Sequence, residues 1–461
     1  MTEWIGAVEA AERLGIKPAS LYAYVSRGVL TRRREADGRA SMFDADEVEK
    51  LARRGRPRRP AGAAELVIES ALTEITASTQ RYRGYDATDL ALRSSFEDVA
   101  LLLWTGSMPD RAARGGPRLQ PSDHQPSDHR PSDHQPAASQ ASAWQATTEA
   151  LAAGRAAQAA LPAGTFLLER LQVIVPALAA TDQFRLHLDR PAVVAAGKAL
   201  IAGMVGALPM QSGGTRAGGP GAGGLGPGAG GLGPGAGGTG AGASGQRGIA
   251  MRLAAKLCTG PVRPGLVRVV NAALVLVADH ELAASTLAAR VAASMRADPY
   301  AVVATGLGAM GGALHGGAAL GAELMLSSAA SAADAPRVVG DLLRRGERLP
   351  GFGHFVYKAG DPRANLLLQL IAEYAPDSPV LAIASAVTDE ARRRALPEPN
   401  IEFALAVLVG VAEMIRGAGE AIFATGRTAG WLAHALEEYE RNIPIRPRSV
   451  YTGPTAGFDA Y

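Results

Sequence analysis

The fold is decided by a long apolar stretch, RPGLVRVVNAALVLVADHELAASTLAARVAAS, at residues 263–294. Alanine, leucine and valine dominate it, and apolar residues recur at spacings of three and four, which is the period of an α-helix. Residues 94–104 and 400–417 show the same pattern. Short runs of alternating polar and apolar residues are scarce. The sequence therefore predicts an all-α body whose helices are hydrophobic enough to be mostly buried.

The totals are those of an ordinary globular protein. Among 461 residues, 20% are charged and 47% are hydrophobic, and the length allows two or three domains. No run of about 20 residues is uniformly apolar, and the first residues lack the basic start and apolar core of a signal peptide. The single cysteine, Cys258, cannot form an internal disulfide. We therefore expect a cytoplasmic protein without a membrane span.

Two segments, near 109–142 and 212–246, are interpreted as inserts. The first contains a repeated PSDH unit with few apolar side chains, and the second consists mostly of glycine. We expect both to be disordered, because neither can bury enough apolar surface to offset the loss of chain entropy. His124, His129 and His134 of the repeat invite a metal site, but repeat expansion explains their spacing without one. No metal site is predicted.

The first 60 residues are basic, whereas the rest of the chain is nearly neutral. They also show a distinctive order of predicted elements. A short helix ends at Gly15 and a second helix follows. Residues 31–43 then form a two-stranded wing that turns at Asp37-Gly38, and Asp44 caps a third helix. A basic head on a neutral body suggests a nucleic-acid-binding module.

This order resembles the winged helix-turn-helix of the MerR and excisionase type. The resemblance implies a DNA-binding domain over residues 1–55, whose second helix enters a major groove while wing arginines contact phosphates. The candidate DNA contacts are Ser20, Tyr22, Arg27 and Arg32. The alternative is a small protein-interaction module with solvated arginines; we favour DNA. The basic residues 56–65 are interpreted as a linker.

Three histidines of the body are candidate site residues: His280, His315 and His354. Each lone histidine is more often a satisfied structural residue than a catalyst. However, glycines flank His315 and His354, and glycine lets a ligand and the backbone approach closely. Glycine also weakens helices, which is a cost that a purely structural site has little reason to carry.

From about residue 66 to residue 461, outside the inserts, the chain resembles citrate synthase. The motifs follow the order of that family: YRGY, ADHE with a following Ser-Thr, LHGGA, GFGH-x-VY with DPRA, PN-I-x-F, and RPR-x-x-YTG. The resemblance implies a large helical domain, residues 66–321 and 422–461. It also implies a small helical domain, residues 322–421, and a homodimer with its active site in the cleft.

The resemblance implies condensation of acetyl-CoA, or a short acyl-CoA, with oxaloacetate to give citrate or 2-methylcitrate and CoA, without a permanently bound cofactor. His315 would donate a hydrogen bond to the thioester carbonyl, Glu402 would remove the methyl proton, and His354 would polarise the ketone. Oxaloacetate would be held by His280, Arg363, Arg427 and Arg446, the last from the partner subunit, and Lys358 would contact a CoA phosphate.

The sequence departs from the family pattern at the site. The catalytic carboxylate of the family is usually aspartate, and here it is Glu402; GHF with Phe355 replaces GHR, and Ala283 and Ala319 replace polar residues. One extra methylene moves a carboxylate by about 1 Å, which can cost about a hundredfold in rate. We expect a working enzyme. The alternative is a DNA-binding transcriptional regulator that uses the body as a metabolite sensor.

Overall fold

The computed structural model of the protein describes residues 4–14, 21, 25, 30–34, 41–49, 68–109, 144–210, 248–312 and 317–449. The chain divides into two compact units, Met1–Glu69 and Ser70–Tyr461. Apart from Pro109, both segments interpreted as inserts lie outside the described residues.

The first unit contains a three-stranded antiparallel sheet of order β1-β3-β2, with β1 at Trp4–Gly6, β2 at Arg32–Arg34 and β3 at Ser41–Asp44. Helix α1, Ala7–Leu14, follows β1. Strands β2 and β3 pair where the wing was predicted. Strand β1 was not predicted, because three residues are too few to show an alternating pattern.

The core of this unit joins the sheet to its helices. Ile5 and Phe43, which pair across β1 and β3, are buried together with Leu21. The Asp44 carboxylate accepts hydrogen bonds from the backbone N–H of Asp46 and Glu47, at 2.9 and 3.2 Å. This is the N-cap that the sequence predicted there.

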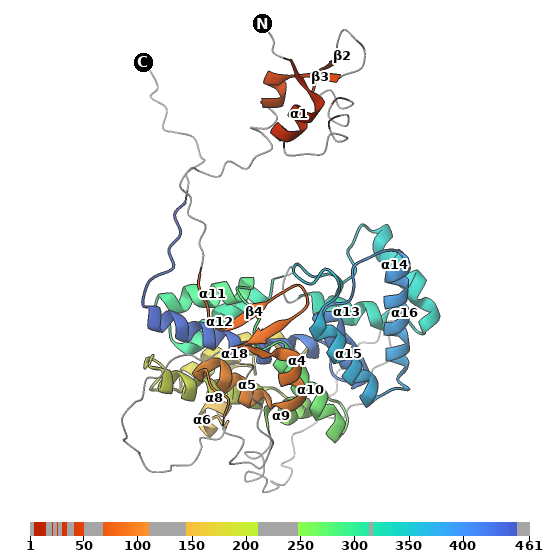
Figure 1. The fold of residues 1–461 in the computed structure, drawn as a ribbon. Helices are drawn as coiled ribbons and strands as arrows, with labels where there is room; N and C mark the ends of the chain where they lie inside the picture. The colour runs from red at the N-terminus through yellow and green to blue at the C-terminus, as the bar shows by residue number, and fades with distance from the viewer. Residues whose placement is uncertain are drawn as a thin grey trace, which may run out of the picture. The chain divides into compact units, whose positions relative to one another are not determined.

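The second unit is helical, as Figure 1 shows, with a three-stranded antiparallel sheet near its start. The all-α body predicted from the sequence is thereby confirmed. The strands are β4 Thr73–Ile75, β5 Gln80–Tyr82 and β6 Tyr85–Asp86. The helices are α4 Ala87–Arg93, α5 Phe96–Thr105, α6 Thr148–Ala156, α7 Leu167–Ala179, α8 Arg190–Ala207, α9 Ile249–Leu257, α10 Pro264–Leu276, α11 Ala284–Ser294, α12 Pro299–Met310, α13 Gly317–Ser327, α14 Ala335–Arg344, α15 Pro362–Tyr374, α16 Pro379–Arg393, α17 Ile401–Val411 and α18 Ala418–Arg441, with a 3₁₀ turn at Ala332–Asp334.

Helix α18 is the central element of this unit. It contacts α5, α7, α8, α10, α11, α12, α13 and α17 and is buried on nearly every side. Glycines allow its close approach to the end of α10. A Cβ at Gly426 would lie 2.6 Å from Val277 Cγ2, and one at Gly430 would lie 2.4 Å from the Ala278 carbonyl oxygen. A larger residue at either position would push the two segments apart.

Helix α8 is long and apolar enough, by length and composition alone, to cross a membrane. Half of it is buried, and it contacts α6, α7, α9 and α18. Leu200 and Ile201 at its middle are completely buried. These contacts are those of a core helix in a folded domain.

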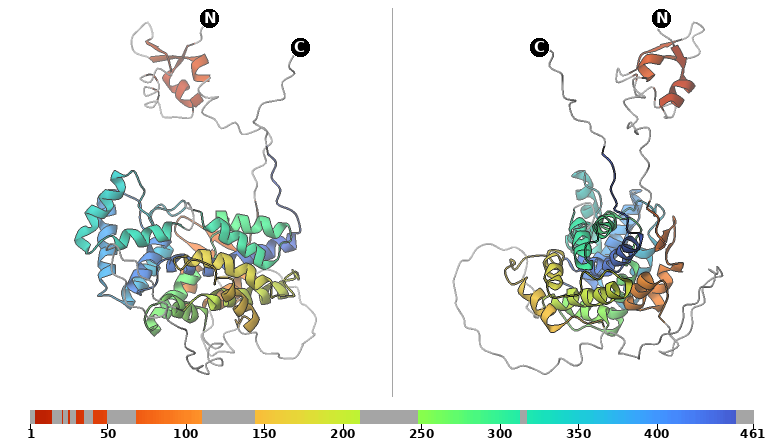
Figure 2. Two further views of the ribbon diagram at one scale, coloured as in Figure 1. Left: turned by 180° about the vertical axis from the view of Figure 1, so that it is seen from behind. Right: turned by 90° about the vertical axis from the view of Figure 1, so that its left-hand side faces the viewer.

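Helices α14, α15 and α16 lie together at one end of the unit, and α17 connects them to α13 and α18 (Figures 1 and 2). Helices α14, α15, α16 and α17 fall within residues 322–421, the range in which we expected the small domain. The loop between α14 and α15 carries His354 and leads to Arg363 at the start of α15. Helix α17 begins one residue before Glu402.

Candidate active site

The turn that carries His354 is held by two glycines against the start of α17. Gly351 and Gly353 have φ angles of +78° and +81°, which other residues rarely adopt. A Cβ at Gly351 would lie 2.8 Å from Phe403 Cβ. The Asn400 backbone N–H donates to the Gly351 carbonyl and its side chain donates to the Gly353 carbonyl, both at 2.9 Å. These contacts fix His354 relative to α17.

The imidazole of His354 is neutral and its tautomer is determined. Nδ1 accepts hydrogen bonds from the backbone N–H of Val356 and Tyr357, at 3.0 and 3.2 Å. Burial, reinforced by the positive charge of Arg363, lowers the pKa of His354 to about 4. The remaining proton therefore resides on Nε2, which can donate it as a hydrogen bond.

His280 lies beside His354 in a cluster of rings. The His280 and His354 ring centroids are 5.0 Å apart, and Tyr357 stacks on His354 at 4.6 Å. Among the described residues, His280 Nε2 is a buried atom without a hydrogen-bond partner. Burial, followed by the charges of Arg363 and Arg427, keeps the pKa of His280 well below its ordinary value. A second neutral imidazole thus has a buried nitrogen available to a ligand.

Asp361 joins the start of α15 to the start of α17. Its carboxylate accepts hydrogen bonds from Nε and Nη2 of Arg363, at 2.9 and 2.7 Å, and from the Ile401 backbone N–H at 3.1 Å. Arg363 is 2% exposed. Burial opposes its charge, but Asp361 outweighs burial and raises the pKa of Arg363. This pairing brings Arg363 next to the helix that carries Glu402.

The sequence did not predict the partner of Arg363. We expected Arg363 to hold a substrate carboxylate, and two of its three guanidinium nitrogens also bind Asp361. Asp361 is the N-cap of α15 and Pro362 is the first residue of that helix. The Arg363 side chain turns back and binds this N-cap residue. Both N–H groups of Nη1 and the second N–H of Nη2 remain for a ligand.

Arg427 enters the site from the middle of α18. It is 1% exposed, and its Nε donates to the Val277 carbonyl at 2.8 Å. Its guanidinium lies over the Phe423 ring at 4.7 Å. Burial lowers the pKa of Arg427 to about 10, with Asp279 opposing the shift. The group therefore stays charged at neutral pH, in surroundings that favour an anion.

Glu402 is the second residue of α17 and is partly buried. Asn400 caps this helix by accepting hydrogen bonds from the backbone N–H of Glu402 and Phe403, at 3.0 and 3.3 Å. Burial raises the pKa of Glu402, although Arg363 and Arg427 act in the opposite direction. A carboxylate with a raised pKa is a stronger proton acceptor than an ordinary glutamate.

The other candidate residues are placed unequally. Lys358 Nζ donates to the His354 carbonyl at 3.1 Å, beside the ring cluster. Arg446 is exposed in the segment after α18. His315 lies outside the described residues, as do three of the candidate DNA contacts, Ser20, Tyr22 and Arg27, whereas Arg32 lies in β2. The structure therefore brings together His280, His354, Arg363, Arg427, Glu402 and Lys358.

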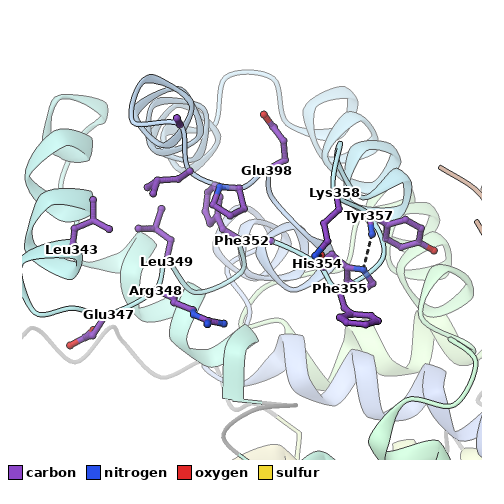
Figure 3. Close-up of a pocket in the computed structure, with 14 residues that line it drawn as sticks. Leu343, Glu347, Arg348, Leu349, Phe352, His354, Phe355, Tyr357, Lys358 and Glu398 are labelled. Carbon is purple, nitrogen blue, oxygen red and sulfur yellow. Dashed lines mark hydrogen bonds between the residues drawn. The ribbon is translucent and has the colours of Figure 1, made fainter. Parts of the chain in front are cut away.

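A cavity of about 840 Å³ opens beside His354. Figure 3 shows Leu343 and Leu349 at one end of it and His354, Tyr357 and Lys358 at the other. Its lining combines apolar side chains with cations and carboxylates, and Phe355 lies at its edge with 90% of its surface exposed.

Both carboxylates of this lining are paired with arginines. Glu347 binds Arg345 at 2.7 Å, and Glu398 binds Arg392 at 2.8 Å. The cations Lys358 and Arg348 are exposed at the same cavity. The cavity therefore favours a ligand that carries negative charge.

A buried charged network beneath His280 escaped the sequence analysis. Asp279 binds Nε2 of His434. The other ring nitrogen of His434, Nδ1, lies 2.5 Å from Nη1 of Arg290. Arginine can only donate, so His434 accepts at Nδ1 and donates from Nε2 to Asp279. Arg290 also binds the buried Glu438 at 2.6 Å. Asp279 belongs to the quoted ADHE motif and Arg290 to helix α11 that follows it, whereas His434 and Glu438 lie about 150 residues away along the chain.

Among the residues that the structure describes, no group of three or more His, Cys, Asp or Glu side chains is placed to hold a metal ion. His124, His129 and His134 of the repeat lie outside them.

Comparison with known proteins identifies the family. The model for the citrate synthase C-terminal domain matches residues 63–448. Citrate synthase 2 of Bacillus subtilis is 29% identical over 392 residues, which cover 84% of this chain and 94% of that protein. The citrate synthase of Haloferax volcanii is 40% identical over 185 residues, covering 39% and 49%. The chain thus spans about half the length of the relatives that it matches at this higher identity.

Solved structures show the same fold. A ternary complex of Thermoplasma acidophilum citrate synthase with carboxymethyl coenzyme A and oxaloacetate matches with a TM-score of 0.61 at 23% identity, over 84% of this chain and 94% of that one. The Pyrobaculum aerophilum citrate synthase matches with a TM-score of 0.61 at 22% identity, over 92% and 95%. Since the family model covers most of the second unit, the chain belongs to the citrate synthase family.

Proposed function

We propose that the protein is a citrate synthase that condenses acetyl-CoA, or a close short acyl-CoA, with oxaloacetate and then hydrolyses the thioester. The observation that carries this proposal is the neutral His354, whose Nδ1 is occupied by two backbone N–H groups and whose Nε2 proton is available beside two buried arginines. No permanently bound cofactor takes part, because CoA enters and leaves as part of a substrate.

The histidines act on the ketone of oxaloacetate. A hydrogen bond from His354 Nε2 to the ketone oxygen withdraws electrons from the carbon that will be attacked, and it strengthens as negative charge develops on that oxygen. His280 holds the same substrate through its buried Nε2. Because both pKa values lie below neutrality, both rings are neutral at pH 7.

The arginines hold the two carboxylates of oxaloacetate. Arg427 contributes a buried positive charge, and Arg363 contributes the N–H groups of Nη1 and Nη2 that Asp361 does not bind. Arg446 supplies a further guanidinium from the partner subunit. Permanently charged, planar donors suit this role because they can bind a carboxylate through two parallel hydrogen bonds.

Glu402 removes a proton from the acyl methyl group. The thioester carbonyl accepts a hydrogen bond from His315 as the enolate forms. The enolate carbon then bonds to the ketone carbon, the π electrons of the ketone move to its oxygen, and that oxygen takes up a proton. Water then cleaves the thioester bond to release the CoA thiol. The raised pKa of Glu402 favours proton removal, and its extra methylene means that the pocket must be set back relative to one built for aspartate.

CoA binds in the cavity beside His354. Its volume, about 840 Å³, suits a ligand of that size, and Lys358 and Arg348 face the negative charge of the phosphates. Apolar lining residues such as Leu343 and Leu349 are suited to the pantetheine chain and the adenine ring.

The protein acts as a homodimer in this proposal. Helix α11 and its C-cap residue expose Leu287, Val291 and Met295, which are four residues apart and therefore form one apolar stripe. A second copy packed against α11 would remove this stripe from water. Ile445, next to Arg446, donates its backbone N–H to the Ser294 hydroxyl at 3.0 Å, so the segment that carries Arg446 contacts the end of helix α11.

The first unit is proposed to be a winged helix-turn-helix that binds DNA. Its β2–β3 pair, the Asp44 cap and the separate core support this interpretation. Arg33 lies over the Trp4 ring at 4.4 Å, so this wing arginine is positioned by strand β1 of the sheet. The relatives named above are called citrate synthases. Their names give no support to the alternative hypothesis of a metabolite-sensing regulator without enzymatic activity.

The catalytic proposal predicts release of free thiol when the purified protein is mixed with acetyl-CoA and oxaloacetate together, and none with either alone. His354→Ala should lower the rate by at least about a hundredfold, because it removes the donor to the ketone oxygen. A thiol-reactive dye measures the rate. Equal rates for the parent and His354→Ala would contradict the proposal, and a parallel series with propionyl-CoA ranks the acyl groups.

For Glu402, we expect Glu402→Asp to lower turnover by about tenfold or more, because the shorter side chain places the base too far from the methyl group. Glu402→Gln should abolish proton removal while leaving oxaloacetate binding nearly unchanged. Since the base must be ionised, activity should fall with decreasing pH through the raised pKa of Glu402, before His354 becomes charged near pH 4. An Asp variant faster than the parent would refute an adapted site.

Subunit mixing tests the dimer and the role of Arg446. Arg446→Ala and His354→Ala should each be inactive as pure proteins. Co-expressed, they should recover about a quarter of parent activity, since half of the dimers are mixed and each has one intact site. Sedimentation gives the mass of each preparation. No recovery in confirmed mixed dimers would show that Arg446 acts within its own subunit.

DNA binding is tested with the full-length protein and a labelled fragment from upstream of its own coding region. Arg32→Ala should weaken binding and reduce the salt dependence by about one phosphate contact. Arg13→Ala, on α1 and paired with Glu9 at 2.6 Å, is the matched control and should change little. No preference for any fragment over competitor DNA at moderate salt would instead favour the protein-interaction module.

A further inference from the structure

Gln80 in β5 forms a buried contact with the loop that carries His354. Its side chain is 2% exposed and makes three hydrogen bonds. Nε2 donates to the Asp279 carbonyl at 2.8 Å and to the Tyr82 hydroxyl at 2.7 Å, while Oε1 accepts from the Tyr357 hydroxyl at 3.2 Å. One amide therefore joins β5, the residue before His280 and the loop of His354.

The orientation of this amide follows from its partners. The Asp279 carbonyl can only accept, and the Tyr82 hydroxyl gives its own proton to the carbonyls of residues 275 and 276, at 3.0 and 3.2 Å. Both therefore require the NH₂ group of Gln80, which leaves Oε1 for Tyr357. Burial raises the pKa of Tyr357 to about 12, so its hydroxyl remains a donor at neutral pH.

Tyr357 transmits this contact to the catalytic imidazole. Its ring stacks on His354 with an interplanar angle of 25° and a centroid distance of 4.6 Å, and its backbone N–H donates to His354 Nδ1 at 3.2 Å. The same ring meets His280 at 5.8 Å. Movement of Tyr357 would therefore displace the imidazole that presents its Nε2 proton to the substrate.

We propose that Gln80 and the Tyr357 hydroxyl are positioning residues for His354, which they hold in the orientation that directs Nε2 into the site. Both side chains are almost completely buried, at 2% exposure each, so the substrate has little of them to touch. The bond joins residues 277 positions apart in the sequence. The kinetic consequence rests on the proposed function, whereas the structural consequence for His354 does not.

Tyr357→Phe tests the proposal with the smallest change, because it keeps the stacked ring and the backbone N–H and removes only the hydroxyl. We expect kcat to fall about 10- to 100-fold, since displacement of a catalytic group by about 1 Å has effects of this size. KM for oxaloacetate should change less than about threefold, because the arginines hold that substrate.

Gln80→Met has nearly the same volume without the amide and should lower kcat to a similar extent. The double variant should be no slower than the slower single variant, because both changes break the same contact. Effects that multiply would show that the two residues act independently and would overturn the proposal.

Tyr300→Phe is the matched control. Tyr300 is also a buried tyrosine, and its hydroxyl donates to Asp182 at 2.9 Å, away from the ring cluster. It should lower the thermal midpoint as much as Tyr357→Phe does while leaving kcat unchanged. If kcat falls equally in both variants, the loss is one of general stability and the proposal is wrong.

Nitrogen-15 NMR of labelled histidines gives a readout that does not need catalysis. In the parent, the His354 signals, assigned with His354→Gln, should show the Nε2–H tautomer and titrate near pH 4. In Tyr357→Phe they should broaden or titrate at higher pH. If Tyr357→Phe left the His354 signals unchanged, the positioning proposal would be overturned. A parent protein that released no thiol would refute the proposed reaction but not the positioning of His354.

Discussion

The close approach of α18 to the end of α10 is the constraint on which the site depends. With no side chain at Gly430, its backbone N–H donates to the Ala278 carbonyl at 2.9 Å. One turn earlier along α18, Arg427 Nε donates to the Val277 carbonyl. The turn that ends in His280 is therefore tied directly to a buried helix. A neutral ring and a buried cation, more than a hundred residues apart in the sequence, become neighbours because glycine leaves room for backbone contact.

Buried charge is balanced unequally around this contact. Arg363 binds Asp361, and Arg290 binds Glu438 and Glu437. The carboxylates beside these two buried cations offset the loss of hydration of their charges. The Nε of Arg427 instead binds a carbonyl, and burial lowers its pKa to about 10. A buried cation with incomplete compensation favours an anionic ligand. The same imbalance suits a dicarboxylate substrate, whose own charge would complete the site.

Local signals allowed part of the structure to be predicted. The spacing of apolar residues predicted the helices, and Asp44 predicted its own cap, because each signal acts over one or two turns. The glycines around His354 predicted an approachable turn for the same reason. The pairing of Arg363 with Asp361 was missed although only Pro362 separates them. Whether an arginine at a helix start turns back or reaches outward depends on the groups around it, here the buried start of α17.

The sequence by itself determined the helical body, the family and the residue types that the chemistry requires, because periodicity and motifs are recorded along the chain. Only the tertiary structure decided which nitrogen of His354 carries the proton, how much of Arg363 remains for a substrate, and that Gln80 supports the site. Hydrogen bonds depend on distance and direction in space. The contacts of Gln80 span 199 and 277 positions along the chain, where no sequence pattern records them.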